Sequence, residues 1–181
     1  MKFDDLLYLY EKYKKTYGKQ SYRYISKLLS EAKELHKRDW LKSPTPNKDH
    51  EQSWRAFKGK NLEKLVLFII KEAVENLGLK IVEGNALERT NSSNLSKELS
   101  IVKRNLFVDY GEFGSQLPDV DIIIYNPQSY AVLAVISSKV TLRERIAQTG
   151  YWKLKLLQDE ATKHIRVYFI TPDEDGTLIK K

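Results

Sequence analysis

Residues 118–145, PDVDIIIYNPQSYAVLAVISSKVTLRER, decide the fold of this 181-residue chain. Two short apolar runs, residues 122–125 and 131–136, flank the turn-forming segment 126–129. Two such runs around a turn predict a β-hairpin. Because the strands of a hairpin are antiparallel, the start of the first strand lies beside the end of the second. We therefore expect the two ends of this stretch to meet at one edge of a sheet.

Residues that can carry chemistry stand at both of these ends. Asp119 and Asp121 open the first strand, and Ser137 and Lys139 close the second. Carboxylates beside a lysine suit a divalent cation and a phosphate. The pattern also allows plainer roles, in which Asp121 is a strand-end acid in solvent and Lys139 extends its ammonium group from a strand end.

Three motifs in this stretch carry a family resemblance: Pro118-Asp119, Ser137-Ser138-Lys139 and Arg143-Glu144-Arg145. Together they resemble the PD-(D/E)xK nucleases in their SxK variant, and within them the CCGG-cutting and EcoRII-like type II restriction endonucleases. The resemblance is closest over residues 118–157 and extends weakly back to about Gly59. It implies an α/β (α+β) fold with a mixed central sheet flanked by helices.

The resemblance also implies the parts of a Mg²⁺-dependent catalytic site. Asp119 is the expected primary metal ligand, and Asp121 is a second or substitute ligand. Lys139 is expected at the attacked phosphate, where it orients or activates the water, and Ser137 holds the place that an acid takes in many relatives. Glu63, at the start of a long helix, is either a further metal ligand or an ordinary exposed glutamate.

One position departs from the family pattern. In the SxK subset an acid on the following helix replaces the one missing at the serine, but the matching positions here are Trp152 and Lys153. The next acids are Asp159 and Glu160. Glu63 is therefore the best substitute for this ligand, and loss of activity is the alternative.

The segment Arg143-Glu144-Arg145 suggests how DNA sequence is recognised. Arginines can bind guanine bidentately in the major groove, and Glu144 can accept from cytosine or hold the arginines in place. The resemblance implies a site containing CC and GG, with Gln148 as a weaker DNA contact. The alternative is a salt-bridged first helical turn. A palindromic site in double-stranded DNA predicts a homodimer, and a restriction enzyme implies a cognate DNA methyltransferase.

Composition sets outer limits on the function. The net charge of +7 favours a polyanionic partner, although a lysine-rich solvated surface explains it equally well. The chain has no cysteine, which excludes disulfides and cysteine-based zinc or redox sites, and its three histidines are scattered. No stretch approaches the roughly 20 apolar residues of a membrane span, so we expect a soluble cytoplasmic protein.

The rest of the chain predicts a helical arm followed by the nuclease core. Helices are expected over residues 4–16 and 21–39, and a proline-containing loop at 43–50 separates an arm of residues 1–50 from a core of residues 51–181. The further elements expected in the core are a helix over 53–77, strands at 79–83, 101–110 and 164–171, and a helix over 141–160 that begins with a Thr141–Glu144 capping box. In that last helix we expect Gly150 to allow close approach to the sheet.

The sequence thus predicts a site-specific endonuclease for double-stranded DNA. A DNA-binding protein on a nuclease fold that cuts poorly or not at all is the alternative, supported by the missing acid. Another nuclease of the same fold, such as a repair or junction-resolving enzyme, is a third candidate.

Overall fold

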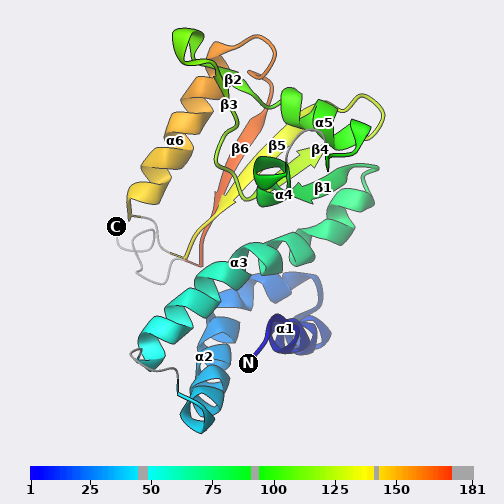
Figure 1. Ribbon diagram of the computed structural model, residues 1–181. Coiled ribbons are helices and arrows are strands. Elements are labelled where there is room, and N and C mark those ends of the chain that lie inside the picture. Colours follow the sequence, from blue (N-terminus) through cyan, green and yellow to red (C-terminus); the bar gives the residue numbers. More distant parts are fainter. Residues whose placement is uncertain (45–48, 91–93, 141–142, 173–181) are drawn as a thin grey trace, which may run out of the picture. The chain divides into compact units, whose positions relative to one another are not determined.

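The computed structural model of the chain describes residues 1–44, 49–90, 94–140 and 143–172. Its helices are α1 (Phe3–Tyr17), α2 (Ile25–Lys42), α3 (His50–Glu75), α4 (Gly84–Arg89), α5 (Lys97–Arg104) and α6 (Arg143–Gln158) (Figure 1). Its strands are β1 (Lys80–Glu83), β2 (Val108–Asp109), β3 (Ser115–Gln116), β4 (Ile122–Tyr125), β5 (Val132–Ser138) and β6 (Arg166–Ile170). Short 3₁₀ helices cover Gly18–Tyr24 and Gly111–Phe113. None of the described helices has the length and apolar character needed to cross a lipid bilayer.

The chain forms two compact units. One contains residues 1–69, and its described part also includes Lys139, Val140, Thr171 and Pro172. The described part of the other unit lies within residues 70–138 and 143–170. The division between the units falls within α3, whereas the predicted boundary between arm and core lies in the loop before α3. That predicted domain division stays a prediction.

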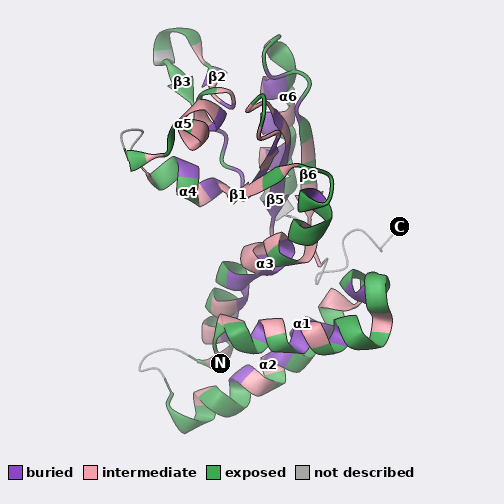
Figure 2. Ribbon diagram, turned by 90° about the vertical axis from the view of Figure 1, so that its right-hand side faces the viewer, coloured by how far each residue is buried: buried purple, intermediate pink, exposed green. Residues whose placement is uncertain are grey.

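The N-terminal unit is helical because α1 and α2 each carry an apolar side. Figure 2 shows buried positions interspersed with exposed ones along both helices. The buried residues join Trp54 and Leu65 of α3 in one core, whose α1 and α2 members are Leu6, Leu9, Tyr10, Tyr13, Leu28, Leu29 and Ala32. The phenol of Tyr10 shares a buried 3.0 Å hydrogen bond with the Ser21 hydroxyl. The predicted helices at 4–16 and 21–39 are confirmed, with the second beginning at Ile25 after the 3₁₀ segment.

The second unit is organised by a four-stranded mixed sheet in the order β1-β4-β5-β6. β4 pairs antiparallel with both β1 and β5, so the predicted hairpin of β4 and β5 is confirmed. β6 joins the other side of β5 in parallel. A parallel neighbour requires a crossover connection, and α6 supplies it between β5 and β6. The predicted fold class, a mixed sheet flanked by helices, is confirmed.

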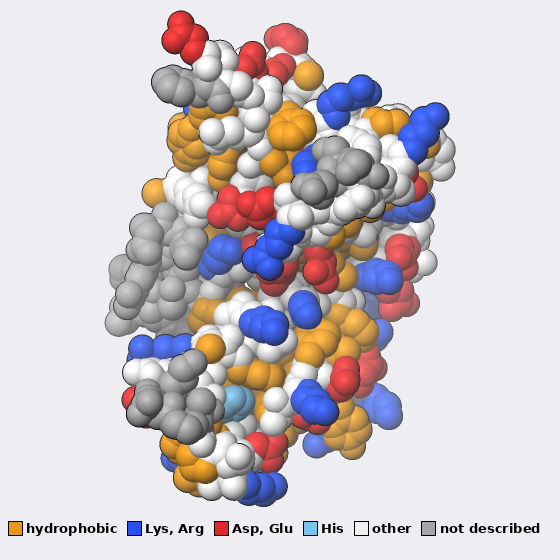
Figure 3. Space-filling view, in the orientation of Figure 1, with side chains coloured by type: hydrophobic (Ala, Val, Ile, Leu, Met, Phe, Trp, Pro, Cys, Tyr) orange, Lys and Arg blue, Asp and Glu red, His pale blue; other side chains and the backbone are white. Residues whose placement is uncertain are grey.

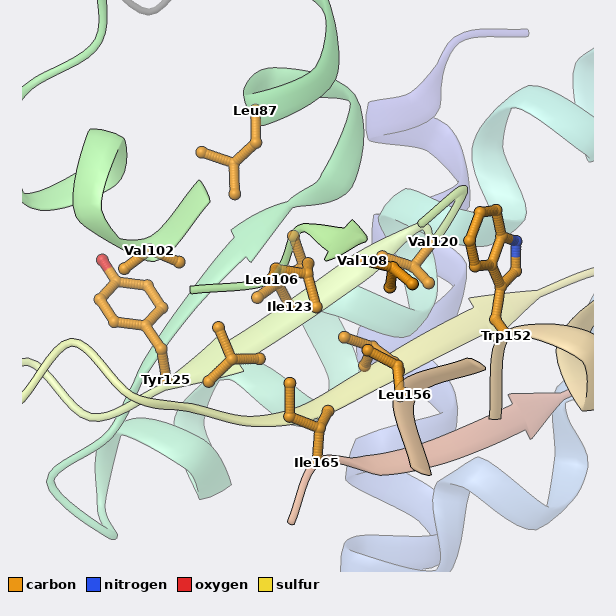
Figure 4. Close-up of a cluster of buried hydrophobic side chains, with 12 residues drawn as sticks. Leu87, Val102, Leu106, Val108, Val120, Ile123, Tyr125, Trp152, Leu156 and Ile165 are labelled. Atoms are coloured by element: carbon orange, nitrogen blue, oxygen red, sulfur yellow. The ribbon is translucent and has the colours of Figure 1, made fainter. Parts of the chain in front are cut away.

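One face of this sheet carries the core of the second unit. Ile123 and Tyr125 of β4 project toward residues of α4, α5 and α6 (Figure 4), and Val135 of β5 belongs to the same core. The helical contributors are Leu87, Val102, Trp152 and Leu156. All of these residues are less than one-tenth exposed. Burying each large apolar side chain stabilises the fold by about 1.5–3 kcal/mol before the entropy of ordering is subtracted.

The strand predicted at residues 101–110 is wrong for most of its length. The segment up to Arg104 belongs to α5, and only Val108–Asp109 forms a strand, paired with Ser115–Gln116. α5 forms because the Ser96 side chain accepts a 3.2 Å hydrogen bond from the Leu99 N–H and caps the helix. Its central apolar residue, Val102, is fully buried in the core.

The expectation that Gly150 lets α6 approach the sheet is also wrong. A Cβ added at Gly150 would meet no atom within 4 Å, because the residue faces outward. Ile146, Leu154 and Leu157, which share helical spacing with Gly150, are 51%, 64% and 48% exposed. Trp152 and Leu156 are buried instead. Both sets have helical spacing, and the sequence pattern alone did not distinguish the buried stripe from the exposed one.

Candidate active site

Three strand ends converge at one edge of the mixed sheet. Ile122 of β4 lies opposite Ile136 of β5 at the end of their ladder. Glu83, the last residue of β1, lies opposite Ile122 on the other side of β4. The end of β1, the start of β4 and the end of β5 are therefore neighbours. The prediction that the acidic and the serine ends of the hairpin meet is confirmed.

Asp121 is the acid held most firmly at this edge. Its N–H donates to the Ile136 carbonyl at 3.0 Å, which extends the β4–β5 ladder by one step. Its carboxylate Oδ2 accepts a 2.6 Å hydrogen bond from the Ser138 N–H, and the residue is only 5% exposed. The plainer alternative, a strand-end acid in solvent, is wrong. The carboxylate is buried because the end of β5 offers it a backbone donor.

Asp119 stands two residues earlier and is exposed. Its carboxylate Oδ2 accepts a hydrogen bond from the side-chain amide of Gln148 on α6, with 2.9 Å between the heavy atoms. The intervening residue, Val120, is buried in the core. Val120, which lies between Asp119 and Asp121 in the sequence, therefore anchors this segment in the core. Gln148 therefore binds Asp119, whereas the sequence interpretation gave it only a DNA contact.

Ser137 and Lys139 complete the sequence-predicted set at the end of β5. Ser137 is 5% exposed and lies beside Phe169 of β6 in the parallel register. Asp121 and Ser137 are the next positions after the Ile122–Ile136 pair. Lys139 follows directly after β5 and is partly buried. Its role at a phosphate stays a prediction.

Gly84 is a structural residue of this edge that sequence reasoning missed. A Cβ built on Gly84 would lie 1.7 Å from the Val120 carbonyl oxygen. The Gly84 N–H donates a 2.8 Å hydrogen bond to the Asp121 carbonyl. Only a glycine allows this approach, and it fixes the backbone that carries both aspartates. The available signal was a glycine directly after the acidic strand end at Glu83.

Glu83 is a third acid near this edge that was not considered from the sequence. It ends β1 and is partly buried. Because it is opposite Ile122, it lies one step from Asp121 along β4. Side chains alternate across a sheet, so Glu83 shares the face of Ile122 rather than that of Asp121.

The donors at this edge are of the kind that Mg²⁺ prefers. No group of three or more His, Cys, Asp or Glu residues that could hold a metal is found within the described ranges. Mg²⁺ keeps several waters and takes only one or two protein carboxylates, so a three-acid cage is not required. The carboxylates of Asp119 and Asp121 fit this requirement in number and chemical type.

Asp159 and Glu160, the acids that follow Trp152 and Lys153, are engaged elsewhere, which matches the departure noted in the sequence. Trp152 is buried in the core, and the Lys153 ammonium donates to the Ile165 carbonyl at 3.3 Å. Asp159 accepts a hydrogen bond from the Ala161 N–H in the turn after α6. Glu160 forms an ion pair with Lys163. These contacts give both acids a structural role outside the candidate site.

Two other sets of predicted residues remain untested. Glu63 lies on α3 in the N-terminal unit and is partly buried. Residues 143–145 form the first turn of α6, as predicted, but their side chains lie outside the described part of the structure, and so does Thr141 of the predicted capping box. The roles of Glu63, Arg143, Glu144 and Arg145 stay predictions.

The aromatic residues of α6, Tyr151 and Trp152, contact Tyr110 and each other. The Tyr110 and Tyr151 hydroxyls share a 2.8 Å hydrogen bond, and the Trp152 ring meets both phenol rings edge to face. Burial, reinforced by the Tyr151 hydrogen bond, raises the pKa of Tyr110 to about 12. The Lys155 ammonium lies 4.8 Å from the Tyr110 ring centroid. Trp152 is therefore a packing residue of the second unit.

Comparison with known proteins identifies relatives along most of the chain. Residues 98–181 match the sequence family described as BsaWI restriction endonuclease type 2. The chain is 36% identical over 169 residues to a putative type II restriction enzyme, MjaVIP, of Methanocaldococcus jannaschii, covering 87% of this chain and 73% of that protein. It is 38% identical over 120 residues to a probable type II restriction enzyme, HpyAORF263P, of Helicobacter pylori, covering 66% of this chain and 60% of that protein.

The similarity to MjaVIP spans more than two thirds of both proteins, and the matched family covers β4, β5, α6, Asp119 and Asp121. The chain therefore belongs to the type II restriction endonucleases and is a site-specific deoxyribonuclease.

Proposed function

We propose that the protein is a Mg²⁺-dependent, homodimeric endonuclease that cleaves a palindromic double-stranded DNA site containing CC and GG. The observation that carries this proposal is the meeting of Asp121 with Ser137 and Ser138 at one sheet edge, with Asp119 two residues before Asp121 in the chain. The relatives support a sequence-specific DNA endonuclease, and the proposal adds the metal, the site and the assembly to that finding.

Each residue at the edge has a chemical role in this proposal. Asp119 and Asp121 hold Mg²⁺, with Glu63 as a further ligand. Bound Mg²⁺ neutralises charge that develops on the attacked phosphate. Lys139 contacts that phosphate and orients the attacking water. Ser137 leaves its position neutral, so the carboxylates must come from elsewhere.

Sequence recognition is assigned to the first turn of α6. Arg143 and Arg145 bind guanines in the major groove, and Glu144 accepts from cytosine or fixes the arginines. Each bidentate contact contributes about 1–3 kcal/mol of discrimination against a wrong base pair. Arginines are not favoured by the dipole at a helix N-terminus, which supports a functional role for them.

A palindromic site read by two equivalent subunits requires two-fold symmetry, so we propose a homodimer in which each subunit cuts one strand. A restriction enzyme must spare its host's DNA. We therefore expect a cognate methyltransferase that modifies the same CC/GG-containing site.

Digestion of a plasmid of known sequence tests the catalytic proposal. The wild-type protein with Mg²⁺ is expected to give discrete fragments that map to one CC/GG-containing site, and Lys139→Ala is expected to lose at least about 10²-fold in rate. Folding of the variant is checked by circular dichroism. Fragments that map to sites without CC and GG would overturn the proposed specificity.

The second candidate is a site-specific DNA-binding protein that cuts poorly. It is favoured by Trp152 and Lys153, which stand where relatives of the SxK subset are expected to carry an acid. Sequence-specific binding with no cleavage at any Mg²⁺ or Mn²⁺ concentration would support it over the first proposal.

A further inference from the structure

The N-terminal unit contains a hollow between the start of α1 and the middle of α3. Its volume is ≈ 420 Å³. The residues that line it are Lys2, Phe3, Ala56, Phe57, Lys60, Asn61 and Lys64. All of them belong to the N-terminal unit, outside the edge that carries Asp119 and Asp121.

The side chains that line this hollow are mainly lysines and apolar residues. Three of its residues are lysines and none is acidic. Lys60 and Lys64 are one helical turn apart, so they stand on the same side of α3. The Lys64 ammonium lies 5.9 Å from the centroid of the Phe3 ring, which links α3 to the start of α1. Figure 3 shows Lys and Arg side chains beside hydrophobic ones on the face that carries α1 and α3.

The floor of the hollow is fixed by Asn61. This side chain is 6% exposed, and its amide donates a 2.7 Å hydrogen bond to the Phe57 carbonyl one turn earlier. Phe57 packs in turn against the aromatic ring of Trp54, with 5.7 Å between centroids. Lys60 and Lys64 therefore project from a packed helix rather than from a loop, which lowers the entropy lost when they bind a ligand.

Two other lysines of the same unit are held in ion pairs. Lys33 is paired with Glu51 at 2.8 Å, and Lys42 with Asp39 at 3.3 Å. No ion pair of the described part of the chain involves Lys2, Lys60 or Lys64. One acid is close to the rim, since the Asp5 carboxylate accepts a 2.6 Å hydrogen bond from the Lys2 backbone N–H. One carboxylate against three ammonium groups leaves the hollow positive.

We propose that Lys2, Lys60 and Lys64 form a binding site for the phosphate backbone of DNA, which holds the duplex without regard to its sequence. Lysine binds phosphate as a point charge and does not require the planar geometry of a base edge. Contacts of this kind position a protein on the duplex and carry no sequence information. The inference rests on the proposed action on double-stranded DNA and adds a second, separate contact to it.

The salt dependence of binding tests the site directly. Affinities for a duplex with the cleavage site and for one without it are measured by fluorescence anisotropy in EDTA, over a series of KCl concentrations. Each phosphate contact contributes about 0.9 to the slope of log K against log salt. The double variant Lys60→Gln with Lys64→Gln is therefore expected to make the slope shallower by about 1.8. It is also expected to weaken the binding of both duplexes by the same factor.

Matched variants separate the site from general charge. Lys12→Gln with Lys15→Gln removes two exposed lysines of α1 that do not line the hollow, and is expected to leave the slope within about 0.5 of the wild type. Lys60→Arg with Lys64→Arg keeps the charges and is expected to restore the slope. Equal loss in the α1 and α3 variants, or an unchanged slope in the α3 variant, would overturn the inference. Neither result changes the interpretation of the cleavage assay. Failure of that assay would contradict the proposed function alone.

A free phosphate compound is the other source of the same chemistry. Titration of the wild-type protein with ATP, followed by calorimetry, distinguishes the two. ATP binding that Lys60→Gln with Lys64→Gln abolishes, together with an unchanged DNA slope, would assign the hollow to a free nucleotide and overturn the DNA inference. The expected result is no saturable ATP binding at concentrations up to about 1 mM, which corresponds to a binding free energy weaker than about −4 kcal/mol.

Discussion

The side-chain amide of Gln148 donates a 2.9 Å hydrogen bond to the Asp119 carboxylate, and so joins α6 to the exposed acid of the candidate site. Hydrogen bonds of this kind orient a metal ligand and tune its affinity, and their loss costs about 10–100-fold in activity or metal binding. Gln148 is thus placed to position Asp119. This role is separate from the DNA contact predicted from the sequence.

Gln148→Ala is expected to lower the cleavage rate by about 10–100-fold and to raise the Mg²⁺ concentration needed for half-maximal rate. Binding of site-containing DNA in EDTA is expected to stay unchanged, because the residue acts through the carboxylate. Gln158→Ala, at the exposed end of the same helix, is the matched control. If Gln148→Ala weakened metal-free DNA binding and left the Mg²⁺ requirement alone, a DNA contact would be the correct role.

Asp119 and Asp121 should differ sharply in stability. Asp121→Ala leaves the buried Ser138 N–H without its acceptor, which costs about 1–3 kcal/mol of unfolding free energy. Asp119→Ala alters an exposed residue and is expected to stay within about 0.5 kcal/mol of the wild type. Both variants are expected to lose cleavage.

Urea unfolding followed by circular dichroism measures the stability difference between these variants, and plasmid digestion measures the activity. Full cleavage by Asp119→Ala with loss only in Asp121→Ala would leave Asp121 as the single aspartate of the site. Equal stability of the two variants would contradict the structural role of the Asp121–Ser138 hydrogen bond.

The sequence predicted the hairpin and the meeting of its ends because both follow from local patterns, namely two apolar runs and one turn. It did not predict that Asp121 would be buried, since that depends on a backbone donor at Ser138, beyond the turn. It also missed the contact of Gly84 with Val120, because two segments far apart in the chain make it. Distant pairings of this kind leave no periodic trace.

The sequence also did not predict which face of α6 is buried. The stripe through Ile146 and Leu154 has the same spacing as the stripe through Trp152 and Leu156, and the structure buries the second. Trp152 and Leu156 pack in one core with Val102 of α5 and Ile123 of β4, and the spacing within α6 does not predict these distant partners. The same reasoning explains α5, where Ser96 as a cap and Val102 as a core residue outweighed a weak alternating pattern.

The N-terminal unit should lose stability in acid through His36. Burial lowers the pKa of His36, and the nearby His50 and the N-terminal amine lower it further, while Asp39 acts in the opposite direction. The folded-state pKa therefore lies below the unfolded value of about 6.5. As the pH falls below about 6.5, the unfolded chain binds the proton first, so stability falls until the pH passes the folded pKa.

His36→Leu is expected to flatten this part of the stability curve, which has a maximum slope of about 1.4 kcal/mol per pH unit for one proton. The measurement is urea unfolding of wild type and variant between about pH 5 and pH 8. Parallel curves for the two proteins across this window would show that His36 does not carry the dependence. The ring of His36 lies 5.3 Å from that of His50, so His50→Leu is expected to reduce the slope as well.

Two glycines of the second unit should respond to alanine with opposite signs. At Gly84 the new Cβ would lie 1.7 Å from the Val120 carbonyl oxygen, so the backbone must shift. Overpacking of this kind costs about 1–3 kcal/mol, and the shift would move the segment that carries Asp121. Gly84→Ala is therefore expected to lower both the unfolding free energy and the cleavage rate.

At Gly150 a Cβ meets nothing within 4 Å, and alanine is the better helix former by about 1 kcal/mol. Gly150→Ala is expected to raise the unfolding free energy by up to that amount and to leave cleavage intact. Urea unfolding and plasmid digestion of the two variants side by side provide the check, and a Gly84→Ala protein as stable and active as wild type would contradict the close approach of Gly84 to Val120.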